Sequence, residues 1–470
     1  MPIAKKTYPT TEMGDAEFFA DMHYDNLVFD HLAGRWMYFD GQHWLQQKTG
    51  EIHRMMIETI RTRQQIAEMT EDDALLKWAM KGESRSRQNN ALWLARNIKP
   101  LAITGEKLWD WDSSVFGVSN GVVDLHSGEL RHGRPSDHIT RVSPLTYDPT
   151  IDTTNWEKFV LDVSNGDEEL ANYMQLIFGY CLTGEVSEQI FWIFYGGGAN
   201  GKSTLIEMML KRVMPQHSWT IDFPGDDWSA ALSNYVRAQL VGRRLVISNE
   251  TERAKRLSAK LIKSFTGSDT IAARHPYGRP FNFEPAAKFI LIVNHEPVID
   301  DDTYAMWRRV REVPFLRTFP VNKDFALNLR RNEARAALAW AVRGAMKYYR
   351  EGFTTPQSVI TATNNYRKSL NSVTRFIEDR CVIDPNARVG VLPMYQALNA
   401  WYDERSAPPH ERMTMRAFQE HMGRDDRFFK MDGKGRGEQG RQFYHGIGLG
   451  PTTAITPKPT ETSGTAETTH

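Results

Sequence analysis

A glycine-rich segment in the middle of the chain contains the residue types that hold phosphate groups. Residues 196–203 read GGGANGKS, which matches the pattern G-x-x-x-x-G-K-[ST] in full. Glycines let backbone N–H groups wrap a phosphate, Lys202 would neutralise the β- and γ-phosphates, and the Ser203 hydroxyl would bind Mg²⁺. The segment therefore predicts a site for ATP and Mg²⁺. Its predicted nucleotide-binding residues are Gly196, Gly197, Gly198, Ala199, Asn200, Gly201, Lys202, Ser203 and Thr204.

A carboxylate at the end of a neighbouring strand would complete a hydrolytic site. Residues 244–249 (RLVISN) have the pattern of that strand, and Glu250 follows it, placed to polarise the attacking water and to support Mg²⁺. Glu252 is the second choice. Asn249 stands where an Asp usually precedes such an acid, so neutral oxygens or another acid would have to help hold the metal. The alternative is that Glu250 is a surface acid after an ordinary strand.

Three further residues could act on the γ-phosphate. Asn294 follows a predicted strand over 288–293, where its amide could hold the phosphate or the lytic water, although a turn residue is the alternative interpretation. Arg308 and Arg309 lie in the segment AMWRRVR. The fixed fork of donors in arginine suits charge stabilisation on a transferred phosphate, and a solvated basic helix end would look similar. The position of these residues after the two nucleotide motifs favours the catalytic interpretation.

Positive charge and an aromatic ring occur together in residues 271–281 (IAARHPYGRPF). No acid lies between Asp269 and Glu284. Phosphate neutralisation combined with base stacking is what a single nucleic-acid strand needs, whereas a Pro/Gly-rich basic turn can also be merely solvated. The predicted DNA-binding residues are Arg274, His275, Tyr277 and Arg279.

Composition narrows the class of protein. The chain has 470 residues, with 58 Lys+Arg against 58 Asp+Glu, and it is 41% hydrophobic. Zero net charge argues against a protein that coats nucleic acid by bulk attraction, and the composition is that of a globular protein. Cys181 and Cys381 are too few for a disulfide framework or a cysteine-rich zinc site. Because no apolar leader or membrane-length run is visible, we expect a cytoplasmic protein without membrane contact.

The elements that must position these residues form a succession of segments. The nearly apolar residues 189–195 before the glycines, and the helical spacing after them, predict strand, loop and helix in the order that phosphate binding requires. Strands alternate with helices from 155 to about 319, which predicts an α/β domain with a parallel sheet. Earlier, hairpins over 36–44 and 120–128 and helices over 51–69 and 72–98 predict a mixed α+β domain.

The C-terminal third of the chain is expected to be simpler. Residues 324–350 predict one helix, and residues 385–450 predict two helices and a glycine-rich hairpin, as in a winged helix. Such a domain would bind duplex or forked DNA, or dock a protein. The expected boundaries are 1–150 for an N-terminal accessory domain, 151–322 for the ATPase core, 323–384 for a helical connector, 385–450 for the winged-helix-like domain and 451–470 for a disordered tail.

Together these motifs resemble the superfamily 3 helicases of phages, plasmids and large DNA viruses, and most closely the poxvirus-type and phage primase-associated branch. The resemblance rests on five collinear motifs, NGVVDLHSGEL, GGGANGKST, LVISNETE, LIVNHEP and WRRVREVPF. It implies an α/β fold with a AAA+-like P-loop core, assembly as a ring that is usually a hexamer, translocation on single-stranded DNA and unwinding of duplexes.

The resemblance also implies roles for single residues. Arg308, with Arg309 beside it, would be the finger that reaches a neighbouring subunit's nucleotide, and Asn294 would be the sensor. The segment 271–281 would be a hairpin that grips DNA in the central channel. The implied partners are single-stranded and forked DNA, further copies of the chain, and a separate primase or replisome protein. A phage-encoded chain would work in the host cytoplasm.

Three alternatives accompany this interpretation. Many relatives carry a primase, but Asp110 and Asp112 are the only tempting acid pair early in the chain, and a tryptophan-anchored turn is the favoured interpretation of them. An ATP-gated DNA-binding protein for replication initiation or loading, without processive unwinding, would carry the same motifs. A small-molecule kinase shares the phosphate-binding loop but would leave the basic hairpin unexplained.

Overall fold

A computed structural model gives the fold. It describes residues 6–103, 109–222, 234–249, 257, 259–267, 269–274, 280–297, 299, 303–320, 322–370, 372–405, 412–423, 428–432 and 442–450. The chain divides into two compact units, residues 1–363 and 364–470, and each unit has its own hydrophobic core. In the described part of the chain, no helix combines the length and the apolar character that a bilayer crossing requires.

The N-terminal part of unit 1 combines a helical lobe with a small sheet. Its helices are α1 (Glu12–His23), α2 (Glu51–Met69), α3 (Asp73–Gly82) and α4 (Arg85–Ala95). The sheet has the order β3-β2-β1-β4 and consists of β1 (Leu27–Asp30), β2 (Arg35–Phe39), β3 (Trp44–Gln46) and β4 (Ala102–Ile103). The hairpin predicted over 36–44 is confirmed, because Phe39 pairs with Trp44 around the turn. The predicted helix over 51–69 is also confirmed.

A second small sheet, of order β7-β6-β5-β8, follows this lobe. Its strands are β5 (Val115–Val118), β6 (Gly121–Asp124), β7 (Leu130–Arg131) and β8 (Val142–Ser143). The hairpin predicted over 120–128 lies between β6 and β7, where the Asp124 carboxylate accepts hydrogen bonds from the backbone N–H groups of His126 and Ser127. The mixed α+β character expected of this part of the chain is therefore confirmed.

A five-stranded sheet of order β10-β11-β14-β9-β15 forms the centre of unit 1. Its strands are β9 (Phe191–Tyr195), β10 (Ser218–Asp222), β11 (Leu245–Asn249), β14 (Lys288–Val293) and β15 (Val310–Pro314). Every neighbouring pair in this sheet is parallel. The predicted α/β architecture with a parallel sheet is confirmed, and the apolar runs that predicted the strands are the buried ones.

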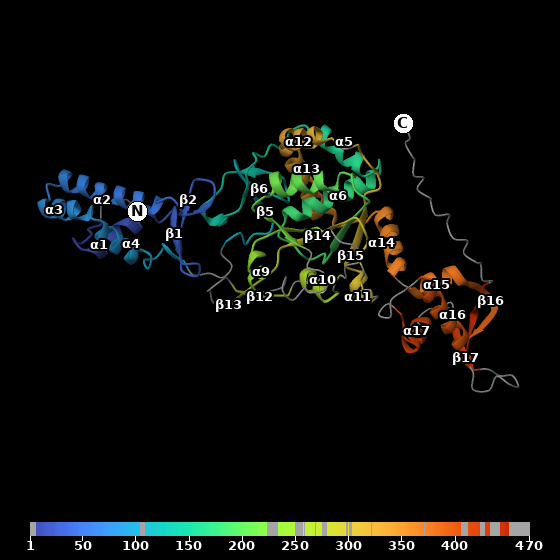
Figure 1. Cartoon of the computed structure of the whole chain (residues 1–470). Coiled ribbons are helices and arrows are strands. Elements are labelled where there is room, and N and C mark those ends of the chain that lie inside the picture. Colours follow the sequence, from blue (N-terminus) through green and yellow to red (C-terminus); the bar gives the residue numbers. More distant parts are fainter. Residues whose placement is uncertain are drawn as a thin grey trace, which may run out of the picture. The chain divides into compact units, whose positions relative to one another are not determined.

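Helices lie on both sides of this parallel sheet (Figure 1). On one side are α5 (Thr154–Val163), α6 (Glu168–Leu182), α12 (Lys323–Asn332) and α13 (Ala334–Glu351). On the other are α9 (Asn234–Gln239), α10 (Ala259–Thr266), α11 (Tyr304–Trp307) and the hairpin of β12 (Ile271–Arg274) and β13 (Pro280–Phe283). Helix α7 (Lys202–Met208) starts directly after the glycine-rich loop and continues as a π-helical turn, Met209–Val213.

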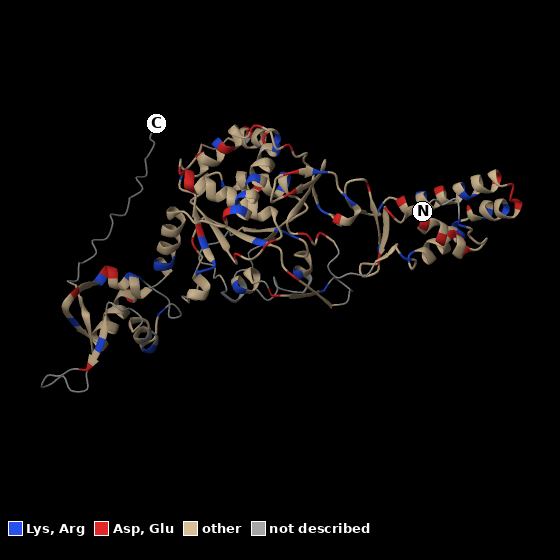
Figure 2. Ribbon diagram, turned by 180° about the vertical axis from the view of Figure 1, so that it is seen from behind, with Lys and Arg blue, Asp and Glu red and all other residues tan. Residues whose placement is uncertain are grey.

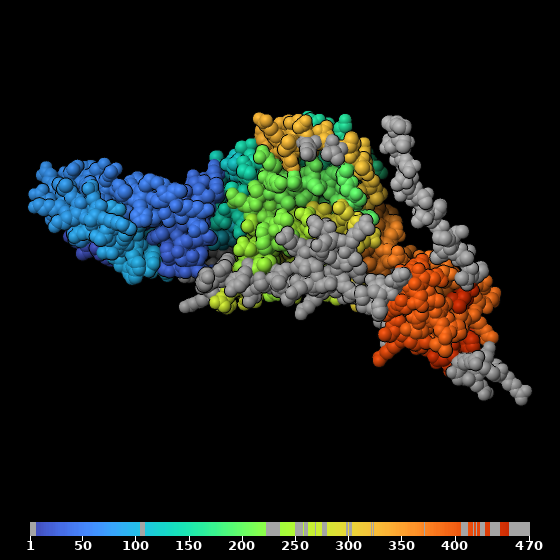
Figure 3. Space-filling view, in the orientation of Figure 1, coloured from blue at the N-terminus to red at the C-terminus, as the bar shows by residue number. Residues whose placement is uncertain are grey.

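Small residues let α6 and α13 pack closely, because a Cβ atom at Gly179 would collide with the backbone of Gly344. Helix α13 packs on α6, and α12 packs on α7 and α13; the gold segment at the top of the space-filling view contains α12, which lies at the surface (Figure 3). The single helix predicted over 324–350 is wrong. Glu333 leaves the helical conformation, with φ −102° and ψ 7°, and separates the exposed α12 from the buried α13.

Unit 2 is a small α+β domain. Its elements are α15 (Ser372–Arg380), β16 (Cys381–Gly390), α16 (Val391–Glu404), α17 (Met415–Met422), β17 (Phe429–Asp432) and β18 (Gln442–Leu449), and α14 (Gln357–Leu370) precedes them. The strands form an antiparallel sheet of order β16-β18-β17. The expectation that this region opens with a helix is wrong at 385–390, which belong to β16. Pro385 lies in an irregularity between Ile383 and Arg388 that interrupts the pairing and obscures the strand signal.

Charged residues of both signs are interspersed along both units, in keeping with the zero net charge (Figure 2). The residues predicted to form a tail, 451–470, lie outside the described part of the chain. The boundaries predicted at 150, 322 and 384 stay predictions.

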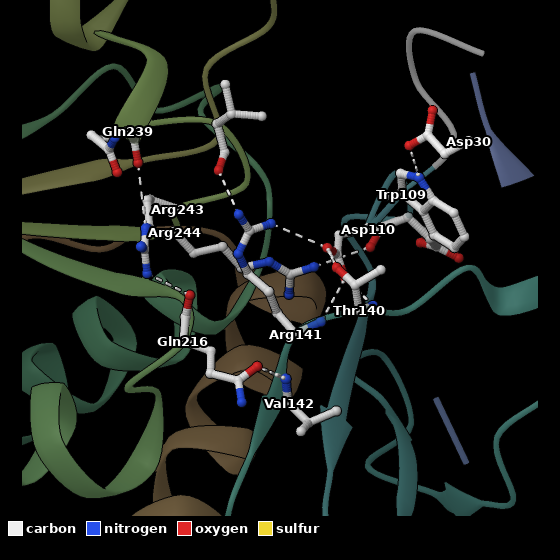
Figure 4. A network of polar contacts seen from close by, with 12 residues as sticks. Asp30, Trp109, Asp110, Thr140, Arg141, Val142, Gln216, Gln239, Arg243 and Arg244 are labelled. Atoms are coloured by element: carbon white, nitrogen blue, oxygen red, sulfur yellow. Dashed lines mark hydrogen bonds and ion pairs between the residues drawn. The ribbon is translucent and has the colours of Figure 1, made fainter. Parts of the chain in front are cut away.

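Buried and half-buried arginines join the small sheet of β5 to β8 to the parallel sheet (Figure 4). Arg141 donates to the Asp110 carboxylate at 3.1 Å and to the Val241 carbonyl at 2.8 Å. Arg244, which is buried directly before β11, donates to the carbonyls of Val115 and Leu182. Burial is the main cause that lowers the pKa of Arg244, to about 10. The hydrogen bonds of Arg244 therefore connect the start of β11 to β5 and to the end of α6.

The acid pair near this network has a structural role. Asp110 accepts hydrogen bonds from Thr140 and Arg141, and Asp112 accepts from the backbone and hydroxyl of Ser114. The neighbouring Trp109 donates its indole N–H to Asp30 at 2.8 Å. The interpretation of these acids as part of a tryptophan-anchored turn is confirmed.

Candidate nucleotide site

The carboxyl ends of three parallel strands meet at a cavity of about 350 Å³. The glycine-rich loop follows β9, Asn249 is the last residue of β11, and Asn294 comes directly after β14. Since β14 lies between β9 and β11, the register brings these ends level: Val293 pairs with Tyr195, and Asn249 with Ile292. The lining consists of Gly198, Ala199, Asn200, Gly201, Lys202, Ser203, Thr204, Asn249, Ile292 and Asn294.

The loop owes its shape to left-handed backbone and to contacts beneath it. Gly198 and Gly201 have φ of 101° and 82°, values that side chains rarely adopt. A Cβ atom at Gly201 would also collide with the Val163 side chain. The Asn200 side chain is buried and donates to the Phe315 carbonyl at 3.3 Å. Asn200, predicted as a nucleotide ligand, therefore holds the loop against the residue that follows β15.

Lys202 is the buried cation of the cavity. Its Nζ donates to the Gly196 carbonyl at 2.6 Å, within the same loop. Burial lowers the pKa of Lys202 to about 8, because desolvation penalises its charged form. A triphosphate in the cavity would supply negative charge to this ammonium and favour its protonated form. Ser203 and Thr204, at the N-terminus of α7, are placed to add hydroxyl groups and the helix N–H groups.

Several predicted site residues lie outside the described part of the chain. These are Glu250, Glu252, His275, Tyr277 and Arg279. Their flanks are described: β11 ends at Asn249 with its side chain exposed at the cavity, and β12 and β13 pair in antiparallel register from Ile271 with Phe283 to Arg274 with Pro280. The two paired strands of the predicted hairpin are therefore present. Arg274, the last residue of β12, is exposed.

Arg308 and Arg309 lie at the opposite end of the sheet from the cavity. They directly precede β15, and the Arg309 carbonyl accepts from the N–H of Phe191, the first residue of β9. The phosphate-binding loop follows the other end of β9, so a strand length of roughly 15 Å separates it from the arginines. Arg308 donates to Gln189 at 2.7 Å. In this arrangement neither arginine lines the cavity of its own subunit.

Sequence reasoning missed Glu312, which is buried in β15 next to these elements. Its backbone N–H donates to the Thr363 hydroxyl, while Oε2 has no hydrogen-bond partner among the described residues. Burial, with a smaller contribution from Glu296, raises the pKa of Glu312 to about 8. The available signal was an acid next to Arg311 within the short strand VREVP, whose other residues are apolar.

Because the pKa of Glu312 is raised, we expect the free energy of unfolding to fall as the pH rises. The unfolded chain releases the proton near pH 4.5 and the folded chain near pH 8, so folding becomes less favourable as the pH rises through this window. Glu312→Gln is expected to match the wild type near pH 5 and to be more stable by about 2–4 kcal/mol at pH 8.5. Thermal melts across this range would measure the difference. The exposed Glu169→Gln is the control, and a pH-independent difference for Glu312→Gln would contradict the assignment.

Two family models match parts of this chain. Residues 16–165 match the family described as "D5 N terminal like", and residues 194–309 match a "Family of unknown function (DUF5906)". The second range contains the glycine-rich loop, Asn249, Asn294 and both arginines.

Individual relatives come from large DNA viruses. "Putative helicase L207/L206" of Acanthamoeba polyphaga mimivirus is 29% identical over 320 residues, which are 62% of this chain and 33% of that protein. "Putative helicase 022R" of Frog virus 3 is 31% identical over 67% of this chain and 43% of that protein. "Putative primase C962R" of African swine fever virus is 21% identical over 63% and 34%. The resemblance that the motifs predicted is confirmed: the chain is similar to proteins of large DNA viruses that are named putative helicase or putative primase.

The chain spans about a third to two fifths of the length of these curated relatives. Among solved structures, the apo structure of the NrS-1 C terminal region aligns with 93% of this chain and 99% of that chain, with a TM-score of 0.47 and 11% identity.

Proposed function

We propose that the chain is an ATP-dependent DNA helicase with a AAA+-like core, which assembles as a ring, translocates on single-stranded DNA and unwinds duplexes in the replication of a virus or phage. The observation that carries the proposal is the single cavity at the carboxyl ends of β9, β11 and β14, which gathers the glycine-rich loop, Asn249 and Asn294. The names of the viral relatives, helicase and primase, support an enzyme of DNA replication.

In the proposed site the residues hold the triphosphate and activate the attacking water. The loop N–H groups and Lys202 hold the β- and γ-phosphates, and Ser203 is a ligand of Mg²⁺, whose charge would neutralise the developing negative charge. Asn294 holds the γ-phosphate or orients the attacking water. Glu250, next to Asn249, accepts the proton of that water and supports the metal.

The proposed oligomer supplies the remaining charge. In the proposed transition state, an arginine would stabilise the charge on the γ-phosphate. Arg308 and Arg309 of the same subunit cannot do so, because they lie at the far end of the sheet from the cavity. A neighbouring copy in a ring, a hexamer in the proposal, would present Arg308 to the site. The hairpin of β12 and β13 would line the channel of that ring and contact the DNA strand through Arg274 and the residues at its tip.

The neutral Asn249 in the cavity favours a second candidate. If no acid supports the metal, hydrolysis is slow, and the protein would act as an ATP-gated DNA-binding or loading factor that works with a separate primase or replisome protein. Primase activity is not proposed for this chain, because Asp110 and Asp112 are engaged in structural hydrogen bonds.

ATPase turnover with and without DNA, measured beside the separation of a labelled fork, tests the proposal. We expect single-stranded DNA to raise kcat several-fold and the fork to separate only with ATP and Mg²⁺. An ATPase rate that DNA does not change, together with a DNA affinity that changes on nucleotide binding, would support the loading factor. A rate that ignores DNA, together with an intact fork and unchanged DNA affinity, would exclude both candidates.

A further inference from the structure

Two arginines directly before β15 share one neutral acceptor. Arg308 and Arg309, which we call the arginine pair, both donate to the side-chain oxygen of Gln189, at 2.7 Å and 3.3 Å. Arg309 also donates to the Ala305 carbonyl, whereas Gln189 is the acceptor that Arg308 contacts in the described part of the chain. A single amide oxygen therefore brings two like charges close together.

The positive charge of the arginine pair is not balanced where it lies. Neither guanidinium forms an ion pair with a carboxylate of the described residues. The acid next to Gln189 in the sequence, Glu188, accepts from the Tyr348 hydroxyl at 3.3 Å instead. Burial, together with the charge of Arg308, lowers the pKa of Arg309, and its Nε atom is buried without a hydrogen-bond partner in the described structure. A neutral oxygen offsets two repelling cations poorly, whereas a phosphate group can accept from both.

The backbone of Gln189 is unusual for its residue type. Its φ is 55°, in the left-handed region that residues other than glycine rarely adopt. Its N–H donates to the Val186 carbonyl at 3.2 Å, so a turn fixes the residue just before β9. Because Phe191 pairs with Val310 in the parallel strands β9 and β15, this turn lies beside the arginine pair. Glycine would adopt the turn without strain, so the glutamine at this position points to a use for its amide.

We propose that Gln189 is a positioning residue for the arginine pair: its amide oxygen holds Arg308 and Arg309 together until a phosphate group of a neighbouring subunit's nucleotide takes its place. Both guanidinium groups then donate to that phosphate. The inference rests on the proposed ring, in which Arg308 reaches a neighbouring site, and it adds a residue that acts only through the arginines. The acceptor has to be neutral, because a carboxylate would bind the arginines too strongly to release them.

Gln189→Glu tests the need for a neutral acceptor. We expect the affinity for a fluorescent ATP analogue to be unchanged and kcat for ATP hydrolysis to fall about tenfold or more, because hydrogen bonds between charged groups are stronger than those to an amide. Gln357→Glu adds the same charge at an exposed glutamine of α14 and should leave kcat unchanged.

Mixed subunits show where the substitution acts. Gln189→Glu mixed with Lys202→Ala should regain part of the activity, because the first variant has an intact loop and the second an intact arginine pair. Gln189→Glu mixed with Arg308→Ala should regain none, because both variants have a defective arginine pair. A purely structural defect at Gln189 would not sort with the arginine variant in this way.

Gln189→Gly separates the amide from the stability of the fold. Because glycine relieves the left-handed backbone, this variant should melt at or above the temperature of the wild type and yet hydrolyse ATP several-fold more slowly. Glu71→Gly is the matched control, since Glu71 is exposed and has a φ of 52°, and it should keep full ATPase activity.

The outcomes separate this inference from the proposed function. If Arg308→Ala stops hydrolysis while both Gln189 variants keep full kcat, the inference is overturned and the helicase proposal stands. It is also overturned if Lys202→Ala rescues Arg308→Ala but not Gln189→Glu, since the substitution would then act on its own nucleotide site. If Arg308→Ala keeps full activity, the proposed arginine finger fails and this inference fails with it.

Discussion

Lys202→Ala is expected to abolish ATP hydrolysis. The Lys202 ammonium is the buried cation that lines the cavity, and the only acceptor within the loop that it contacts is the Gly196 carbonyl, which a phosphate oxygen can replace. Loss of a preorganised charge at a developing oxyanion costs about a hundredfold to a thousandfold in rate. Steady-state ATPase assays, with a fluorescent nucleotide to follow binding, would measure both effects.

Lys211→Ala is the matched control for this experiment. Lys211 lies on the continuation of the same helix, is exposed and pairs with Glu207 at 3.0 Å, so its loss should leave hydrolysis unchanged. Full ATPase activity of Lys202→Ala would mean that the glycine-rich loop does not hold the reacting phosphate. Equal losses in both lysine variants would point to an unfolded helix rather than to a lost charge, and circular dichroism would separate the two.

Arg308→Ala is expected to bind ATP with unchanged affinity and to hydrolyse it at least about a thousandfold more slowly. The arginine lies at the end of the sheet opposite the cavity, so its loss leaves the nucleotide contacts of its own subunit intact. A mixture of Arg308→Ala with Lys202→Ala subunits should regain part of the activity, because some interfaces combine an intact arginine with an intact loop.

Three further measurements test whether the effect of Arg308→Ala is specific to that arginine. Arg309→Ala tests the second arginine of the pair, which donates to the same Gln189 side chain at 3.3 Å. Arg350→Ala removes an exposed arginine at the end of α13 that pairs with Glu351, and should have no effect. If the mixture shows no recovery although the subunits exchange, an arginine that acts on a neighbouring nucleotide is excluded.

The local parts of the site could be predicted from the sequence because each is encoded by adjacent residues. The glycine-rich loop lies between an apolar run and a helical pattern, so its position at the end of β9 follows from a few neighbouring residues. Asn294 could be placed in the same way, after β14. The order of strands could not be predicted, since β14 enters the sheet between β9 and β11 through pairings between segments far apart in the chain.

The features that the sequence did not predict also depend on contacts between distant parts of the chain. Glu333 separates the mostly exposed α12 from the mostly buried α13, and no proline or glycine marks the break. Strand β16 was not predicted because it contains Pro385, and proline is rare inside strands. It is tolerated here because the pairing with β18 is irregular at that point. The burial of Glu312 depends on helices that pack against β15 from elsewhere in the chain, which hydrophobic periodicity does not report.

The hydrogen bonds of Arg141 and Arg244 limit which parts of this protein can be exchanged with those of a relative. Arg244 donates to the backbone carbonyls of Val115 and Leu182, and the half-buried Arg141 donates to that of Val241. The segment of β5 to β8 and the segment before β11 therefore each supply an acceptor for an arginine of the other. In a chimaera that exchanged residues 16–165 with those of a relative, the segment around position 115 would have to follow the same path to keep a backbone carbonyl within reach of Arg244. A shift of that segment would leave this buried guanidinium with fewer acceptors, which costs several kcal/mol. The two family regions are therefore expected to be inherited as a pair.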